Sequence, residues 1–106
     1  MPSWPYSLIE YRTPELGPVI VGLVVYDSEP AIHVLEYLPP VLGNQERAAM
    51  AVRSLVNRLR RADLGTDDMR IEAFRRRQAN AVRLSPPRVV EAPSAREALS
   101  ALLRPD

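Results

Sequence analysis

The first half of the chain carries the apolar patterns that are typical of β-strands. Polar and apolar side chains alternate over residues 6–12, and residues 19–26 form an apolar run that only Gly22 interrupts. A third strand is expected over residues 31–38, after a turn that Pro30 closes. Gly22 predicts a β-bulge or the close approach of another backbone. Because consecutive strands with short connections pair most simply with one another, we expect an antiparallel meander.

The middle of the chain predicts the longest helix, over residues 44–64. No proline occurs between positions 41 and 85, and proline breaks helix interiors. Apolar residues recur there at helical spacing. This apolar stripe consists of Ala48, Val52, Leu55, Val56 and Leu59. Asn44 can cap the start of the helix, and Gly65 suits the position that follows its end at Leu64.

A second, shorter helix is expected directly after the first. Thr66 or Asp67 can cap its start, and Ile71 and Phe74 would face inward. The helical pattern fades near residues 78–80. The connection between the two helices is therefore short.

The end of the chain predicts two extended stretches and a third helix. The stretches cover residues 81–85 and 88–91, with two prolines between them. Ser94 and Glu97 have the spacing of a capping box, in which each side chain satisfies a backbone N–H of the other residue. The helix that follows would be stopped by Pro105.

Together these elements predict an α+β fold, because strand patterns and helix patterns occupy different parts of the chain. We expect an antiparallel sheet of three or more strands, with one long helix and two shorter helices. A length of 106 residues suits a single domain spanning residues 1–106. Within it, residues 1–40 form a strand-rich part, residues 44–80 a helical part, and residues 81–106 an extended segment with a terminal helix.

The composition excludes most catalytic chemistry. The chain has no Cys and one His, His33, so disulfides, thiolate chemistry and Cys-ligated zinc are excluded. Nucleophile elbows and phosphate-binding or dinucleotide-binding loops are missing from the sequence. The neighbouring Asp67 and Asp68 suit a helix N-terminus without any metal. We therefore expect no enzyme activity, no catalytic residue, no cofactor and no metal.

The same reading gives an expectation about location. The chain contains no apolar run of 18 residues, and its start lacks the basic and apolar regions of a secretory signal. The absence of cysteine is typical of a protein that needs no disulfides. We expect a cytoplasmic protein that does not bind membranes.

Charge is distributed unevenly, and all 14 basic residues are arginine. Residues 1–43 carry one Arg against five acidic residues, a net charge of −4, whereas residues 44–106 carry 13 Arg against 8 acidic residues, a net charge of +5. The candidate site is the cluster of Arg70, Arg75, Arg76, Arg77, Arg83 and Arg88. It is interpreted either as a solvated face or as a contact for phosphate or an acidic protein.

Three sequence motifs resemble one bacterial family. The motifs are YSLIEY over residues 6–11, VIVGLVVYD over residues 19–27 and NAVRLSPPRVV over residues 80–90, followed by the terminal helix over residues 94–103. They resemble the family called domain of unknown function 3037, which usually has Asn where this chain has Ile20. A polar contact made by that Asn would be absent here. The resemblance implies no established activity, and it implies a protein partner, with a HipA-like kinase encoded nearby as the candidate.

Two function classes follow from these observations. The first is a non-catalytic interaction or regulatory module that binds another protein. The alternative is a nucleic-acid-binding accessory protein that uses the cluster of Arg75, Arg76 and Arg77. Nucleic-acid-binding domains usually have a pI above 9 and a recognisable module, whereas this chain has a pI near 8.2 and no such module. A protein partner is therefore favoured.

The apolar run over residues 19–26 also suggests a homodimer. Three short helices need not cover both faces of a sheet, and an uncovered apolar face commonly becomes an interface. In the alternative arrangement, the helices and residues 88–91 cover that face within one chain.

Overall fold

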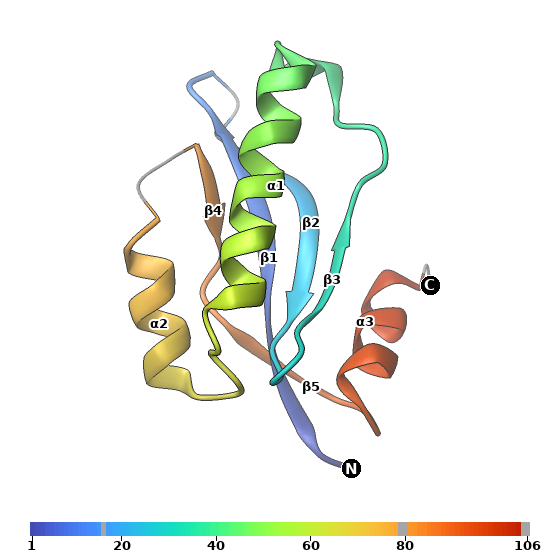
Figure 1. The fold of residues 1–106 in the computed structure, drawn as a ribbon. Helices are drawn as coiled ribbons and strands as arrows, with labels where there is room; N and C mark the ends of the chain where they lie inside the picture. The colour runs from blue at the N-terminus through green and yellow to red at the C-terminus, as the bar shows by residue number, and fades with distance from the viewer. Residues whose placement is uncertain (16, 79–80, 105–106) are drawn as a thin grey trace.

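The computed structural model describes residues 1–15, 17–78 and 81–104. Its centre is a five-stranded antiparallel sheet, with α1 and α2 packed on one face and α3 on the other (Figure 1). The strands are β1 (Ser3–Thr13), β2 (Gly17–Val25), β3 (Ala31–Val34), β4 (Val82–Leu84) and β5 (Arg88–Glu91). The helices are a 3₁₀ turn η1 (Pro40–Leu42), α1 (Gln45–Arg61), α2 (Asp68–Arg76) and α3 (Ala95–Leu103). The expected α+β class is confirmed.

Strand β1 lies at the middle of the sheet and pairs along both of its edges. The strand order is β3-β2-β1-β4, and β5 also pairs with β1, next to β4. The first four residues of β1 face β5, and residues 9–11 face β4, so β4 and β5 together form one edge. Pro86 and Pro87 separate these two short strands. The expected meander of the first three strands is confirmed, with the last two strands added beside β1.

Strand β2 contains the bulge that Gly22 predicted. Its register with β1 shifts between Ile9 and Glu10, which pair with Gly22 and Ile20, so Val21 is the extra residue. Gly22 also lies against β3, because a Cβ atom placed on it would be only 2.5 Å from the carbonyl oxygen of His33. Both reasons for a glycine therefore hold at this position.

Strand β3 is shorter than the sequence predicted. A strand was expected over residues 31–38, but β3 ends at Val34, and its last ladder contact is the N–H of Leu35 donating to the carbonyl of Val21 at 2.9 Å. Val21 is the bulged residue, and a bulge bends a strand and increases its local twist. Beyond this point β2 pairs only with β1, so residues 36–38 have no strand beside them.

Helix α1 begins where expected and ends three residues early. The Asn44 side chain accepts a hydrogen bond from the N–H of Arg47 at 3.0 Å, which caps the start. The prediction that the helix continues to Leu64 with Gly65 after it is wrong, because α1 ends at Arg61. The chain turns instead at Asp63, whose φ is 51°, a conformation that Asp tolerates better than most residues. Leu64 is thereby turned into the core.

Both shorter helices start at the caps that the sequence predicted. The Asp67 carboxylate accepts from the N–H groups of Met69 and Arg70, at 2.9 and 3.1 Å. Ser94 accepts from the N–H of Glu97 at 3.1 Å, which is one half of the expected capping box. The Glu97 carboxylate accepts from the Ser94 hydroxyl at 3.5 Å instead of from the backbone N–H of Ser94. Helix α2 ends at Arg76, just before the fading expected near residues 78–80. Residues 79–80 and the stop expected at Pro105 lie outside the described residues.

Two apolar clusters cover the two faces of the sheet. The larger one joins Ile9, Val21 and Val24 to α1 and α2, whose Leu55 and Ile71 are fully buried. The smaller one joins Val25 to Ala95 and Ala98 of α3. The second half of strand β2 is therefore covered on both faces within one chain. This is the arrangement that was given as the alternative to a homodimer formed through residues 19–26. Near its start, Pro18 is exposed and Ile20 is 54% exposed.

A buried polar pair lies inside the larger cluster. The Tyr26 hydroxyl donates to Ser7 Oγ at 2.9 Å, and both side chains are almost completely buried. Burial raises the pKa of Tyr26 to about 12, although the hydrogen bond with Ser7 acts in the opposite direction. The phenol therefore stays protonated in the folded chain at pH values where it ionises in an unfolded one.

We expect Gly22→Ala to lower the free energy of unfolding by about 1–3 kcal/mol, since the added methyl group would displace the His33 carbonyl. Urea denaturation measures this change. Ile20→Ala, two residues away at an exposed position, is the control and should cost less than about 1 kcal/mol. Equal losses in the two variants would contradict the close approach.

The free energy of unfolding should fall between pH 10 and 12. Because the folded-state pKa of Tyr26 is raised to about 12, its contribution is complete below pH 10 and is lost as the pH rises through 12. The loss amounts to up to roughly 3 kcal/mol, at about 1.4 kcal/mol per pH unit. No lysine titrates between pH 10 and 12, because the chain contains no Lys.

Urea denaturation at a series of pH values tests this expectation. The matched variant is Tyr26→Phe, which should remove most of the slope and cost about 1–3 kcal/mol at neutral pH by leaving the Ser7 hydroxyl unpaired. A slope that persists unchanged in Tyr26→Phe would assign it to another group.

Candidate functional site

Two of the predicted arginines are held by one carboxylate of their own helix. Arg75 donates twice to Glu72, through Nη2 at 2.6 Å and Nε at 3.1 Å. Arg76 donates to the same carboxylate at 3.3 Å. Both contacts follow from the spacing of three and four residues along α2, which places these side chains on one helix face. The Arg75–Arg77 run is thus partly neutralised.

The pKa values of this group follow from the same contacts. The hydrogen bond from Arg75 holds the pKa of the Glu72 carboxyl below its usual value, against a desolvation that raises it. In turn, the hydrogen bond to Glu72 raises the pKa of Arg75. Both groups are therefore charged over the whole range in which the protein would function. Arg75 and Glu72 form a structural ion pair near the Tyr26 hydroxyl.

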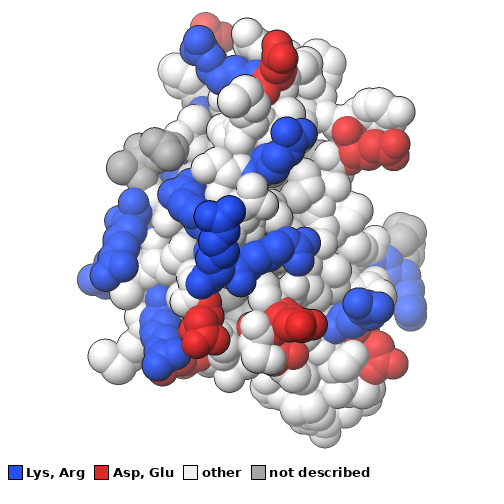
Figure 2. Space-filling view, viewed as in Figure 1, with Lys and Arg blue, Asp and Glu red and all other residues white. Residues whose placement is uncertain are grey.

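The other two arginines of α2 and its cap, Arg70 and Arg77, line a groove between α1 and α2. The groove encloses about 630 Å³, and Phe74 and Ala73 lie along it. From α1, Arg58 and Arg61 line the same groove. We call these four residues, Arg58, Arg61, Arg70 and Arg77, the basic groove. Figure 2 shows arginine side chains gathered over α1 and toward α2 on this face of the molecule.

Two members of the basic groove are positioned by hydrogen bonds. Arg58 donates to the Gln78 side chain at 2.6 Å, and Gln78 in turn donates to the Phe74 carbonyl at 3.1 Å. Arg70 donates to the carbonyl of Asp63 at 3.2 Å and lies 3.9 Å from the Asp67 carboxylate. Across the described ranges, Arg61 and Arg77 form no ion pair. These two guanidinium groups can therefore bind carboxylate or phosphate oxygens.

Arg83 and Arg88 lie apart from the basic groove. Arg83 is paired with Glu10 in the sheet, between Val82 and Leu84, which point into the cluster below α1. Because side chains alternate along a strand, Arg83 points to the opposite face. Arg88 is exposed on β5 and pairs with Tyr6, whose side chain also packs on the α3 side. The structure thus divides the six predicted arginines between two faces of the sheet.

Sequence reasoning missed Arg58 and Arg61 as members of the site. The sequence did indicate that these two arginines share one outer face of α1, because both lie off its apolar stripe and are three residues apart. What the sequence lacked was the antiparallel arrangement of α2 beside α1, which Figure 1 shows and in which Arg58 contacts Gln78. This arrangement brings Arg58 and Arg61 to the same groove as Arg70 and Arg77, which are 9 to 19 residues away in the chain.

The described residues contain neither a candidate metal site nor a candidate membrane span. Across residues 1–15, 17–78 and 81–104, no three His, Asp or Glu side chains come close enough to hold a metal ion. His33 is half-buried on β3, on the sheet face opposite α1. In the same ranges, no helix combines the length and apolar character needed to cross a membrane.

The chain was compared with known proteins at the levels of family, sequence and fold. The resemblance to domain of unknown function 3037 remains a prediction that rests on the three motifs and the terminal helix described above. No protein-family model matches the chain, and neither curated proteins nor solved structures give a significant match. The proposed function therefore rests on the basic groove and on the surfaces beside it.

Proposed function

We propose that this chain is a non-catalytic interaction module that binds an acidic segment of another protein in the basic groove. The observation that carries the proposal is that four arginines, from α1, α2 and the C-cap of α2, line one groove in which Asp63 is the single acidic residue among the lining residues described. Arginine binds carboxylates through two parallel hydrogen bonds, which gives such contacts orientation as well as strength. The exposed flank of Phe74 adds an apolar surface for a neighbouring side chain of the partner.

A short acidic peptide fits the groove better than a nucleic acid does. The arginines surround a hollow of about 630 Å³ instead of following a long stripe, as a phosphate backbone would require. In addition, Arg75 and Arg76, on which the nucleic-acid alternative depends, are already paired with Glu72. Nucleic-acid binding by the Arg75–Arg77 run is therefore kept as an outcome of the test.

The partner and its location complete the proposal. The resemblance to domain of unknown function 3037 supports a HipA-like kinase encoded nearby as the partner to examine first. Placement in the cytoplasm is supported by the absence of cysteine from the chain. In such a pair, this chain would supply a rigid basic surface and the partner would supply the acidic segment.

The double variant Arg61→Glu/Arg77→Glu should lose the partner. It replaces two unpaired guanidinium groups by carboxylates that repel an acidic segment, and both positions are exposed, so the fold should be retained. We expect a partner protein retained by the immobilised wild-type chain from host-cell extract to bind the variant at least tenfold more weakly. Quantitative mass spectrometry of the retained proteins measures this ratio.

The control is Arg12→Glu/Arg47→Glu, which makes the same charge change at two exposed positions outside the groove. It should retain the partner. Nuclease treatment of the extract separates the alternatives, because a protein held through nucleic acid would be released. Release by nuclease, or equal loss of the partner from both double variants, would contradict the proposal.

Purified protein should contain no stoichiometric metal and no tightly bound cofactor. The expectation rests on the missing nucleophile, metal and cofactor motifs in the sequence. Native mass spectrometry and elemental analysis measure it directly. A stoichiometric metal or a bound organic group would contradict the non-catalytic assignment while leaving the basic groove to be tested separately.

A further inference from the structure

A small hollow lies on the flank of α1 that faces the end of β3. It encloses about 290 Å³, and Glu36 and Arg53 are the charged residues among its described lining. The remaining described lining residues are apolar and come from β3, from the residues that follow it and from α1: Val34, Leu35, Leu38, Ala49, Val52 and Val56. We call this site the apolar hollow.

The apolar hollow is open to solvent because the side chains that line it are only partly covered. Val34, Leu38 and Val56 pack against the larger apolar cluster but stay partly exposed, and Leu35 is 40% exposed. The volume lies at the lower end of the roughly 300–1,000 Å³ of pockets that hold whole organic ligands. The apolar hollow therefore suits one apolar side chain of a larger partner better than a separate small molecule.

Shared residues connect the apolar hollow to the basic groove across the outer face of α1. Arg53 lines both the apolar hollow and a middle hollow of about 300 Å³ beside it. Arg58 and Arg61 line this middle hollow and also the basic groove. The other described residues of the middle hollow are Met50, Ser54 and Asn57. The three sites therefore form one continuous surface.

This surface crosses α1 from one flank to the other, since β3 and α2 lie on opposite sides of the helix (Figure 1). A helix with its side chains is about 10–12 Å wide, and the lining residues of α1 in the two outer sites are offset by roughly 10 Å along the axis. An extended segment that joins the two sites spans roughly 15–20 Å, which takes about five or six residues.

Positive charge dominates this surface. Five arginines line the three sites, whereas Glu36 and Asp63 are the acidic residues among the lining residues that the structure describes. A segment that runs from the basic groove to the apolar hollow passes Arg53 on its way. Charge complementarity therefore favours an acidic segment along the whole path.

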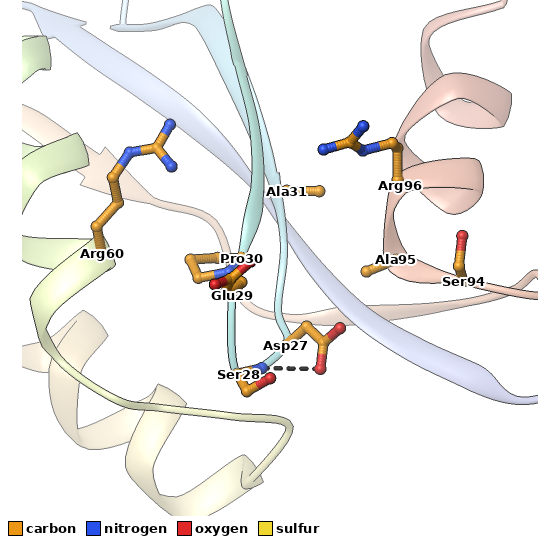
Figure 3. Close-up of a pocket in the computed structure, with 9 residues that line it drawn as sticks. All are labelled: Asp27, Ser28, Glu29, Pro30, Ala31, Arg60, Ser94, Ala95 and Arg96. Atoms are coloured by element: carbon orange, nitrogen blue, oxygen red, sulfur yellow. Dashed lines mark hydrogen bonds between the residues drawn. The ribbon is translucent and has the colours of Figure 1, made fainter.

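The larger hollow at the start of β3 is not part of this surface. It encloses about 720 Å³, and none of its described lining residues lines any of the other three sites. Figure 3 shows that Asp27 and Glu29 line it together with Arg60 and Arg96. Because its two carboxylates would repel an acidic segment, this hollow is a poorer continuation of the basic groove than the apolar hollow is.

We propose that the acidic segment bound in the basic groove crosses α1 in an extended form and places one apolar side chain in the apolar hollow. The partner's segment then carries acidic residues and, about five or six positions away, an apolar anchor. The basic groove alone would accept many acidic chains, so the anchor adds discrimination between them. The inference rests on the proposed function, because one segment occupies both sites.

Fluorescence anisotropy with labelled synthetic peptides tests the two sites separately. The probes contain a run of glutamates and a leucine separated by about five serines, with the leucine at either end. One matched peptide has serine in place of leucine, and another has leucine directly beside the glutamates. We expect the better spaced peptide to bind at least about tenfold more tightly than the leucine-free one, because the leucine becomes buried. The adjacent leucine cannot reach the apolar hollow and should add little.

The variant Leu35→Glu places a carboxylate in the apolar hollow at an exposed position, so the fold should be retained. It should reduce the affinity ratio between the spaced and the leucine-free peptide to near unity. Tyr37→Glu is the matched control, since it makes the same charge change at an 83% exposed position outside the described lining. It should keep the wild-type ratio, whereas Arg61→Glu/Arg77→Glu should weaken the binding of every peptide.

The outcomes separate this inference from the proposed function. If the leucine-free peptide binds but the spaced leucine adds nothing, or if Leu35→Glu keeps the wild-type ratio, the inference is wrong and the proposed function stands. An equal loss of the ratio in Tyr37→Glu would also overturn the inference. If no peptide binds the wild-type chain, both are wrong. A dimer of the free chain that Leu35→Glu dissociates in sedimentation velocity would assign the apolar hollow to a second copy instead.

Discussion

The pairing of β1 with three other strands is the constraint on which the rest of the molecule depends. β1 contributes backbone hydrogen bonds along both edges, to β2 over nearly its whole length and to β4 and β5 in succession. The N-terminal strand is tied to the end of the chain as well, because Trp4 Nε1 donates to the Ala92 carbonyl at 2.9 Å. Because β1 pairs along both of its edges, it holds together the sheet on whose two faces the helices pack.

The bulge at Val21 determines how far the sheet extends beyond β2. It bends β2 at the point where β3 would otherwise continue, and so it ends β3 at Val34. The short strand leaves an open edge, with one hollow at its start and a second one, lined by Leu35 and Glu36 with residues of α1, at its end. The bulge in the pairing of β2 with β1, next to the close approach of Gly22 to β3, thereby also shapes this edge of the sheet.

Local ion pairs decide which arginines are available for a partner. Glu72 binds Arg75 and Arg76 at the spacing that an α-helix provides, so the densest run of positive charge is partly neutralised within α2. Arg61 and Arg77 have no such carboxylate within a turn on their own helix face. Their convergence in the basic groove shows that a count of neighbouring charges is a poor guide to a binding surface.

The sequence by itself determined the elements whose causes are local. The caps at Asn44, Asp67 and Ser94 and the stripe of α1 each depend on residues within a few positions, and each is found in the structure. Gly22 marked the bulge in the sequence, although the bulge itself forms in the pairing of β2 with β1. Only the tertiary structure decided where β3 and α1 end, since the first depends on the twist of β2 and the second on Leu64 entering the core. The division of the arginines between two faces was likewise decided by packing, because strand register and helix–helix contacts join residues that are distant along the chain.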